Sequence, residues 1–365
     1  MSLSVGIVGL PNVGKSTLFN ALTKKGAETA NYPFCTIDPS VGVVTVPDDR
    51  LAKLSAFSAS KKTVPAIVEF VDIAGLVKGA SEGQGLGNQF LAHIRETDAI
   101  AEVVRIFDDA DIIHVDGKID PLSDIEVIGA ELVLADLATV EKRRTNISRD
   151  VKRGDKIAIA EDAGLAKVLA VLNAGNWART ASIDPGELPF VRQLGLITMK
   201  PVLYALNKRA GSTNLDEIKD ERWEKLMAYF ARANAKFVIV DAKIEDELNQ
   251  FEGEEREAFR EELGAKDDGI NDLIIGAYDI LGLMTYFTTG GDESRAWTVK
   301  RGSSAPEAGM AIHTDFKDKF IRAEVINWKT LLDSGSYAAA REKGLVRTEG
   351  KEYIVQDGDV IEFKI

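Results

Sequence analysis

The chain has 365 residues, with a hydrophobic content of 45% and an aromatic content of 7%, which is ordinary for a globular protein of two or three domains. Its net charge of −13 argues against nonspecific wrapping of nucleic acid by the whole surface, but leaves room for a local basic patch. The single cysteine, Cys35, excludes an intrachain disulfide and disfavours a cysteine-based zinc site, and no apolar run approaches the ~18 residues of a membrane span. We therefore expect a cytoplasmic protein with neither a membrane nor a DNA partner.

The first motif along the chain matches GxxxxGK[ST], the phosphate-binding loop, and consists of Gly9-Leu10-Pro11-Asn12-Val13-Gly14-Lys15-Ser16. An apolar strand is predicted before it and a helix after it, which is the context that the motif requires. Gly9 and Gly14 allow the tight turn that brings backbone N–H groups onto phosphates, and the helix N-terminus adds its positive dipole end. Lys15 would supply a charge to the β- and γ-phosphates, and Ser16 a hydroxyl to Mg²⁺.

The first third of the chain predicts alternating strands and helices, and hence a parallel sheet with helices on both faces. The strand candidates are residues 3–8, 41–46, 66–71 and 100–106. Thr36 lies between the first helix and the second strand, where a hydroxyl can complete the Mg²⁺ shell while a γ-phosphate is present. We expect Thr36 to belong to a switch that orders with triphosphate and relaxes with diphosphate.

A second motif, Asp72-Ile73-Ala74-Gly75, follows the apolar run 66–71. A carboxylate at the end of such a strand sits beside the phosphate loop and can hold Mg²⁺ through a water, and Gly75 would offer an N–H to the γ-phosphate. The next residue is Leu76, where many GTPases carry a glutamine that orients the attacking water. Since leucine cannot do this, we expect slow hydrolysis or help from another group.

Histidine is the residue type best suited to assist the water, and two histidines are candidates. His114 ends an apolar stretch in the α/β half, and His93 follows the glycine-rich segment 83–88. A structural role is as well supported as a catalytic one for each of them. His313 lies in the C-terminal part and is expected to be structural.

The character of the chain changes near Pro121, where two helices are predicted at 123–156 and near 158–173. They suggest an antiparallel helical hairpin inserted into the α/β domain, with Ser123 and Glu126 as a capping box. A basic cluster near its turn comprises Lys142, Arg143, Arg144, Arg149, Lys152 and Arg153. It is either a solvated helix face or a contact to RNA phosphates.

Sheet-like sequence resumes at 201–206 and 236–240. The first of these strands is followed by Asn207-Lys208-Arg209-Ala210, at a place where guanine-specific proteins carry Asn-Lys-x-Asp. Ala210 cannot accept the two hydrogen bonds that an aspartate accepts from guanine, which makes guanine specificity doubtful. The second strand is followed by Asp241-Ala242-Lys243, where a loop that backs the base would lie.

The last eighty residues predict a small β-rich domain with short strands and Asp-Gly turns. Its strand candidates are residues 297–299, 320–325, 353–355 and 360–363. The predicted domains are therefore a discontinuous α/β domain at 1–120 and 197–282, a helical insertion at 121–196 and the β-rich domain at 283–365.

Stretches along nearly the whole chain resemble the YchF/Obg-like ATPase family of translation-factor-related P-loop proteins, in the Obg-related TRAFAC class. The matching stretches are residues 6–17, 31–36, 71–80, 88–91, 112–115, 295–298, 312–316 and 353–359. Long matches that occur in this order in three predicted domains are very specific.

This resemblance implies a G domain with a coiled-coil arm and a C-terminal TGS domain of β-grasp type. It also implies Mg²⁺-dependent binding and slow hydrolysis of ATP in preference to GTP, and association with the ribosome. By resemblance, the triphosphate site is Asn12, Val13, Gly14, Lys15, Ser16 and Thr17, and the Mg²⁺ ligands are Ser16 and Thr36. Leu76 matches the family's hydrophobic replacement of the catalytic glutamine, and His114 matches a histidine thought to assist the water.

The chain departs from the family pattern in base recognition, because Ala210 and Asp241 stand where the family usually has glutamate and serine. Asn207 and Lys208 are closer to a GTPase, so an Obg-type GTPase or a dual ATP/GTP hydrolase is the alternative. A third reading is a ribosome- or RNA-binding module in which hydrolysis is incidental. Asn12 in the loop is compatible with K⁺ as a second cation.

Overall fold

The computed structural model describes residues 3–26, 40–73, 86–108, 119–251, 253–262 and 269–365. The chain divides into two compact units. Of the described residues, those at 3–26, 40–42 and between 69 and 273 form the first, and those at 43–68 and 274–365 form the second. The three-domain division expected from the sequence stays a prediction; the units differ from it by grouping residues 43–68 with the C-terminal part. Among the described residues, no helix is long and apolar enough to cross a membrane.

The first unit is built on a six-stranded sheet with the order β2-β4-β1-β5-β7-β9. Its strands are β1 (Ser4–Val8), β2 (Val41–Thr45), β4 (Ile67–Asp72), β5 (Ala99–Arg105), β7 (Val202–Asn207) and β9 (Lys236–Val240). The pairings from β4 through β1, β5 and β7 to β9 are all parallel. Every residue of the central strand β5 is buried, as expected when helices cover both faces. The predicted α/β fold is confirmed, and each predicted strand of this sheet lies within two residues of the observed one.

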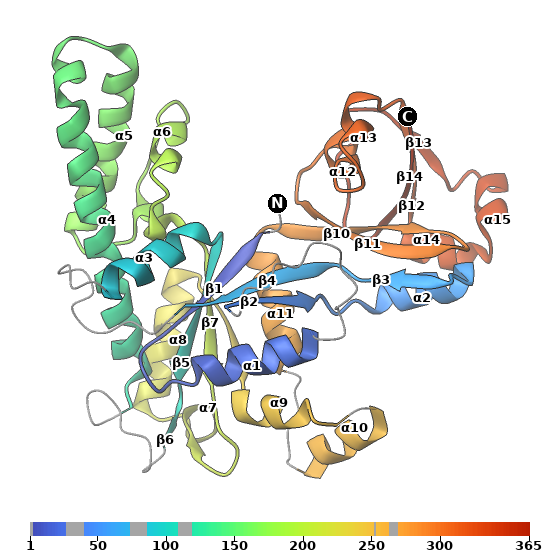
Figure 1. Ribbon diagram of the computed structural model, residues 1–365, viewed down its shortest axis with the longest axis horizontal. Helices are drawn as coiled ribbons and strands as arrows, with labels where there is room; N and C mark the ends of the chain where they lie inside the picture. The colour runs from blue at the N-terminus through green and yellow to red at the C-terminus, as the bar shows by residue number, and fades with distance from the viewer. Residues whose placement is uncertain (1–2, 27–39, 74–85, 109–118, 252, 263–268) are drawn as a thin grey trace. The chain divides into compact units, whose positions relative to one another are not determined.

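Helices and a two-stranded sheet complete the first unit (Figure 1). The α-helices are α1 (Lys15–Gly26), α3 (Leu86–Glu96), α4 (Pro121–Lys152), α5 (Lys156–Asn173), α6 (Leu188–Gln193), α7 (Leu215–Ile218), α8 (Glu221–Ala233), α9 (Ala242–Leu248), α10 (Gly253–Glu262) and α11 (Gly269–Ile280), of which α11 continues into the second unit. The 3₁₀ helices are η3 (Ala178–Thr180) and η4 (Ile197–Met199). Strands β6 (Phe107–Asp108) and β8 (Thr213–Asn214) pair antiparallel.

Helices α4 and α5 form the predicted antiparallel arm, which extends away from the sheet of the first unit (Figure 1). The apolar seam between them includes Val140, Ile147, Leu165 and Val168. The predicted capping box is wrong: the N-cap is Asp120, whose carboxylate accepts from the Ser123 N–H at 3.2 Å, and Pro121 opens the helix. Proline suits this position because its missing N–H would have no partner there.

The basic cluster of the arm is partly neutralised by ion pairs between its two helices. Arg143 pairs with Glu161 at 2.5 Å, and Arg144 pairs with Asp162 at 2.7 Å, each through two hydrogen bonds. These two arginines therefore brace the hairpin. The basic side chains near the turn that lie outside these two pairs are also exposed; they are Lys142, Arg149, Lys152, Arg153 and Lys156.

The root of the arm is held by a buried carboxylate on α4. Asp136 is fully buried and accepts hydrogen bonds from the Ile197 N–H at 3.0 Å, the Thr198 N–H at 2.7 Å and the Thr198 hydroxyl at 2.7 Å. Arg95 of α3 donates to the Thr139 hydroxyl one turn further along α4. The helix that follows the Asp72-x-x-Gly75 motif is thus bonded directly to the arm.

A second buried carboxyl, Glu102, lies on β5 in the middle of the sheet. It is 1% exposed, and its Oε1 has no hydrogen-bond partner among the described residues. Burial, reinforced by the nearby charge of Asp124, raises the pKa of Glu102 well above its ordinary value. The folded protein therefore holds a proton on Glu102 at pH values where the unfolded chain has released it.

We expect Glu102→Gln to remove a pH dependence of stability. Above the ordinary pKa of 4.5 the unfolded state binds fewer protons at this position than the folded state, so the wild type loses stability as pH rises. The stability advantage of Glu102→Gln should grow as the pH rises above 4.5, by up to about 1.4 kcal/mol per pH unit while Glu102 of the folded protein stays protonated. Urea unfolding of both proteins at several pH values measures this difference, and a difference that does not change with pH would contradict it.

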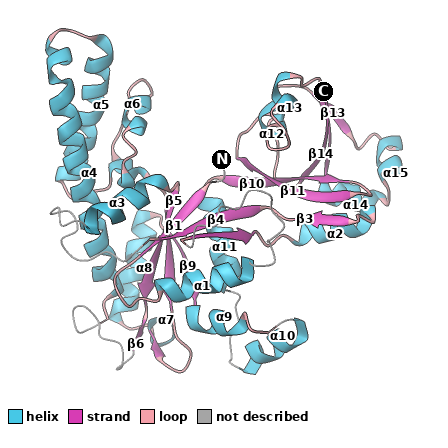
Figure 2. Ribbon diagram, viewed as in Figure 1, coloured by secondary structure: helices cyan, strands magenta, loops and turns pink. Residues whose placement is uncertain are grey.

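The second unit contains a six-stranded sheet with the order β13-β12-β14-β10-β11-β3 (Figure 2). Its strands are β3 (Lys62–Val64), β10 (Leu283–Thr289), β11 (Glu293–Lys300), β12 (Arg322–Asn327), β13 (Arg347–Glu349) and β14 (Asp359–Lys364). Its helices are α2 (Asp49–Ser58), α12 (Ala305–Gly309), α13 (Asp315–Asp318), α14 (Trp328–Ser334) and α15 (Tyr337–Glu342). The predicted β-rich C-terminal domain is confirmed. The predicted strand at 353–355 is not: it contributes one bridge, Ser304 to Ile354.

Residues 43–68 belong to this unit because polar contacts tie them to it. Arg50 of α2 donates to Asp357 at 2.6 Å, and the same carboxylate accepts from the Thr285 N–H at 3.0 Å. Strand β3 also pairs with β11 at the edge of the sheet. Contacts between residues some 300 positions apart are invisible to a local pattern, so the sequence does not predict this grouping.

Candidate nucleotide-binding site

The phosphate-binding loop lies between β1 and α1, and close packing determines where its glycines stand. Gly14 has a φ of +98°, and a Cβ there would overlap the amide nitrogen of Asn207. A Cβ on Gly9 would lie 2.6 Å from the Val103 carbonyl oxygen of β5. Asn12 at the exposed bend adopts a left-handed φ of 62°, which asparagine tolerates better than most residues. The loop is therefore packed closely against β5 and β7.

Lys15 is the cation of this loop, and it is 9% exposed. Its ammonium group donates to the Leu10 carbonyl at 2.7 Å, which folds the side chain back along the loop. Burial lowers the pKa of Lys15, and the charge of Asp72 opposes that shift. In the same way, burial raises the pKa of Asp72 and the charge of Lys15 lowers it. The two groups share one electrostatic environment at the carboxyl edge of the sheet.

Hard oxygen donors stand at this edge in the described part of the chain. Asp72 ends β4 directly beside Ile7 of β1, and Ser16 lies exposed in the first turn of α1. A hydroxyl and a carboxylate are oxygen ligands of the type that Mg²⁺ takes, and the donor set fits this ion. Thr17 follows half-buried.

Asn207 connects the phosphate-binding loop to the far side of the site. Its amide nitrogen donates to the Val13 carbonyl at 2.8 Å, and its amide oxygen accepts from the Ala242 N–H at 3.1 Å. The residue is 4% exposed. The next residue, Lys208, is half-buried and bonds through its N–H to the Val240 carbonyl. Asn207 thus clamps three loops that follow β1, β7 and β9.

The base-side loop is held by a carboxylate whose role the sequence did not predict. Asp241 caps α9 by accepting from the N–H groups of Lys243 and Ile244, and its second oxygen accepts from the Ala210 N–H at 2.6 Å. It is 7% exposed, and three backbone donors engage it. An aspartate directly before a helix is an N-cap signal that could have been noticed. The bond to Ala210 crosses between loops and has no local signature.

Several predicted site residues lie outside the described part of the chain. These are Thr36, Gly75, Leu76 and His114. His93 is described: it is exposed on α3. The residues that the structure brings together are those of the loop, Asp72 and Asn207, at one edge of one sheet.

Family models match both ends of the chain. Residues 4–136 match a model described as "50S ribosome-binding GTPase". Residues 283–365 match the model YchF-GTPase_C, described as "Protein of unknown function (DUF933)".

Full-length relatives are similar to the whole chain. The protein named "Ribosome-binding ATPase YchF" of Bacillus subtilis is 53% identical, with 100% of this chain and 99% of that protein covered. The protein of the same name from Escherichia coli O157:H7 is 47% identical, with the same coverage. The solved structure of the Schizosaccharomyces pombe YchF GTPase is 38% identical with a TM-score of 0.87, and the match covers 100% of this chain and 98% of that one.

Proposed function

Because this chain belongs to the YchF family, we propose that it is a ribosome-associated nucleotide switch of the cytoplasm that binds and slowly hydrolyses ATP with Mg²⁺. The observation that carries this proposal is the convergence of the phosphate-binding loop, Asp72 and Asn207 at the carboxyl edge of one parallel sheet. Ligands bind at this edge in open α/β sheets. The names of the relatives support the ribosome as partner.

The roles of the residues follow from their chemistry. The N–H groups of residues 12–17 and the ammonium of Lys15 would bind the phosphates. Ser16 and Thr36, with Asp72 behind them, would hold Mg²⁺, which neutralises phosphate charge when bound. Gly75 would donate its N–H to the γ-phosphate. His114 is the proposed group for the attacking water, because Leu76 cannot orient it.

The base preference would come from the loops that Asn207 and Asp241 hold. A guanine presents two donors that need an acceptor, and the Ala210 side chain offers none. The Asp241 carboxylate already engages three backbone donors, so it is a poor substitute. Adenine does not present this pair of donors, so the lack of an acceptor at Ala210 weakens GTP binding and leaves ATP as the preferred nucleotide. The word "GTPase" on both matched models and on the Schizosaccharomyces pombe structure keeps GTP as the alternative substrate.

Calorimetric titration with Mg²⁺-ATP and Mg²⁺-GTP tests the proposed preference. We expect ATP to bind at least about tenfold more tightly, which corresponds to about 1.4 kcal/mol. In Ala210→Asp, which supplies the missing acceptor, we expect the affinity for GTP to rise while that for ATP does not. Equal or tighter GTP binding by the wild type would replace the proposal with an Obg-type GTPase or a dual hydrolase.

The exposed basic residues near the turn of the arm are the proposed contact to ribosomal RNA phosphates. We expect the triple charge reversal of Lys142, Arg149 and Lys152 to glutamate to weaken co-sedimentation with ribosomes by about tenfold or more. The reason is that each basic side chain in contact with a phosphate contributes favourable electrostatic free energy to binding. The matched control reverses Lys219, Lys225 and Arg232, which are exposed elsewhere in the same unit. Equal co-sedimentation of the two triple variants would remove the arm from this role.

A further inference from the structure

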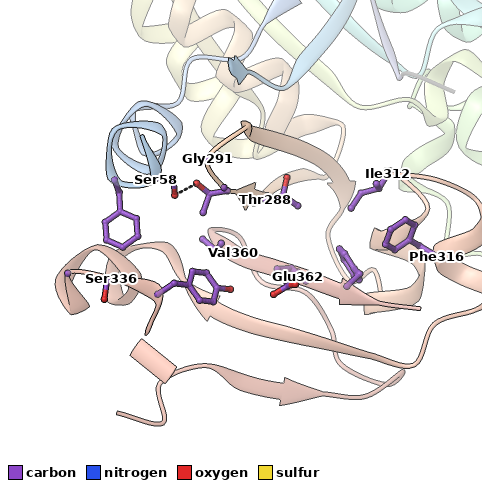
Figure 3. Close-up of a pocket in the computed structure, with 15 residues that line it drawn as sticks. Ser58, Thr288, Gly291, Ile312, Phe316, Ser336, Val360 and Glu362 are labelled. Carbon is purple, nitrogen blue, oxygen red and sulfur yellow. Dashed lines mark hydrogen bonds between the residues drawn. The ribbon is translucent and has the colours of Figure 1, made fainter. Parts of the chain in front are cut away.

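A cavity of about 660 Å³ lies within the second unit, between two strands of its sheet (Figure 3). The parallel strands β10 and β14 are paired at one position, Phe287 with Val360, and beyond this pair they are not joined in the sheet ladder. Among the lining residues that the structure describes, Glu362 is the one charged side chain, and it pairs with Arg341 at 3.1 Å and also with Lys364. The chain therefore neutralises this charge itself, and the cavity presents none to a ligand.

A buried donor without an acceptor lies in the first unit, where the helical arm meets α3. Arg95, in the last turn of α3, donates from Nη2 to the Thr139 hydroxyl of α4 at 2.8 Å. Its Nε is buried and has no hydrogen-bond partner among the described residues. A buried N–H without an acceptor has lost its hydration without compensation. The contact to Thr139 therefore leaves part of the guanidinium fork unused.

A second acceptor lies on the same face of α4. Asp136 precedes Thr139 by three residues, which places the two side chains about 4.5 Å apart along the helix axis. The Asp136 Oδ1 accepts one hydrogen bond, from the Ile197 N–H, so it has room for another. A carboxylate matches the guanidinium fork better than a hydroxyl does. Arg95 nevertheless bonds to Thr139 in this structure.

The charge of Arg95 already acts on Asp136 from this position. Burial raises the pKa of Asp136, and the hydrogen bonds from Thr198 and Ile197, together with the charge of Arg95, oppose that rise. Arg95 thus has two possible arrangements on α4, one on a neutral hydroxyl and one on a buried carboxylate.

Lys200 anchors the end of α3 through its main chain. The Lys200 ammonium donates to the Arg95 carbonyl at 3.0 Å and also to the Thr97 carbonyl, at the end of a helix where carbonyl groups lack helical partners. Lys200 directly follows η4, which Asp136 binds through the Thr198 N–H at 2.7 Å. The end of α3 is therefore held at the root of the arm, while the Arg95 side chain stays able to change its partner.

The same end of α3 packs against the strand end that carries Asp72. Ile73 and Thr97 are both buried and meet over Gly6 of β1. A Cβ on Gly6 would lie 2.7 Å from the Ile73 side chain and 3.1 Å from the Thr97 hydroxyl, which itself donates to the Ile94 carbonyl of α3 at 2.9 Å. In an interior packed this closely, a displacement of Ile73 is passed through Thr97 to α3.

We propose that Arg95 moves from the Thr139 hydroxyl to the Asp136 carboxylate when Mg²⁺ and a nucleoside triphosphate engage Asp72, and that this step turns the helical arm. The arm then takes one orientation without nucleotide and another with it, so that the nucleotide controls how the exposed basic residues near its turn are presented. The inference rests on the proposed function, because it requires a triphosphate beside Asp72. All of the contacts that carry it lie within the first unit.

Double electron–electron resonance between two spin labels measures the orientation of the arm. The labels are attached to Asn146→Cys on α4 and Lys236→Cys at the start of β9, both exposed positions, in a chain that carries Cys35→Ser. We expect both Mg²⁺-AMP-PNP and any Mg²⁺-GMP-PNP that binds to shift the mean distance by about 2 Å or more. A triphosphate that binds in calorimetry and leaves the distance unchanged would overturn the inference alone. If neither analogue binds, the proposed function fails and the inference fails with it.

Thr139→Val removes the present partner of Arg95 and nearly keeps the side-chain shape. We expect this variant to show, without nucleotide, the distance that the wild type shows only with it, because Asp136 is then the acceptor within reach. Thr145→Val is the matched control: each threonine hydroxyl donates to the carbonyl four residues earlier on α4 at 2.9 Å, but Thr139 also accepts from Arg95. Thr145→Val should follow the wild type in both states. If Thr139→Val does the same, Arg95 has no second position and the inference is wrong.

Arg95→Gln tests the same step from the other side of the contact. Without a guanidinium for either acceptor, this variant should still bind triphosphate but lose the distance change that the nucleotide causes. Arg179→Gln removes another arginine from the root of the arm, one that donates to the Lys200 carbonyl at 3.1 Å, and should keep the distance change. Loss of the change in both variants would show a general loosening of the arm and would overturn the role of Arg95, as would a full distance change in Arg95→Gln.

Discussion

Lys15→Ala should abolish tight binding of nucleoside triphosphate, with a loss of roughly a hundredfold or more in affinity for Mg²⁺-ATP and Mg²⁺-GTP alike. Lys15 is 9% exposed, so its attraction to phosphate is screened little by water. It lies in the loop beside Asp72, whose negative charge would repel phosphates once Lys15 is gone. Calorimetric titration measures the effect.

The same substitution should leave the fold intact. Burial disfavours the Lys15 charge, so its removal relieves a desolvation cost while it frees the Leu10 carbonyl. Lys24→Ala is the matched control, because Lys24 is on the same helix and pairs with Asp246 at the surface. We expect both variants to keep the wild-type circular dichroism and only Lys15→Ala to lose nucleotide. If Lys15→Ala binds within threefold of the wild type, the site assignment is wrong.

Asn207→Asp should damage both binding and stability, because one side chain bridges two loops. The aspartate cannot donate to the Val13 carbonyl, and its charge would face that oxygen inside the protein. An unsatisfied buried group costs about 1–3 kcal/mol. Release of the loop should weaken ATP binding by about tenfold or more, since the free loop must be ordered again when the nucleotide binds. Calorimetry and urea unfolding give the two quantities.

Asn249→Ala is the control that separates a role of Asn207 in nucleotide binding from the general loss of stability when a side-chain hydrogen bond is removed. The Asn249 amide donates to the Ala21 carbonyl at 2.7 Å, which is the same kind of bond at a place outside the nucleotide loops. We expect this variant to lose stability and to keep its affinity for ATP. Should Asn207→Asp lose no more affinity than Asn249→Ala, Asn207 would be a structural residue without a part in the site.

Local patterns in the sequence sufficed for much of the fold. The strand before the phosphate-binding loop and the strand that ends at Asp72 were predicted to within two residues of their observed bounds. This was possible because buried parallel strands are apolar runs bounded by turns. The helical arm was predicted from its periodicity. The capping box at Ser123 was wrong, because Asp120 and Pro121 compete for the same helix start and make better N-terminal residues there. The strand at 353–355 was wrong because this segment pairs with another part of the chain through one bridge, Ser304 to Ile354, and Ile354 itself is 44% exposed.

Short stretches of the sequence indicate the kind of protein: a phosphate-binding loop between a strand and a helix, an acidic residue at the end of a neighbouring strand, an inserted helical hairpin and a β-rich C-terminal part. These features depend on residues near one another in the chain, where spacing and chemistry can be read directly. The contacts that hold the site together become visible only in the folded protein. Asn207 meets Val13 across 194 positions, and Asp241 meets Ala210 across 31. The folded structure likewise shows that Arg143 and Arg144 brace the arm and that β10 parts from β14. Such contacts arise from the packing of distant elements, which leaves no periodic signal in the sequence.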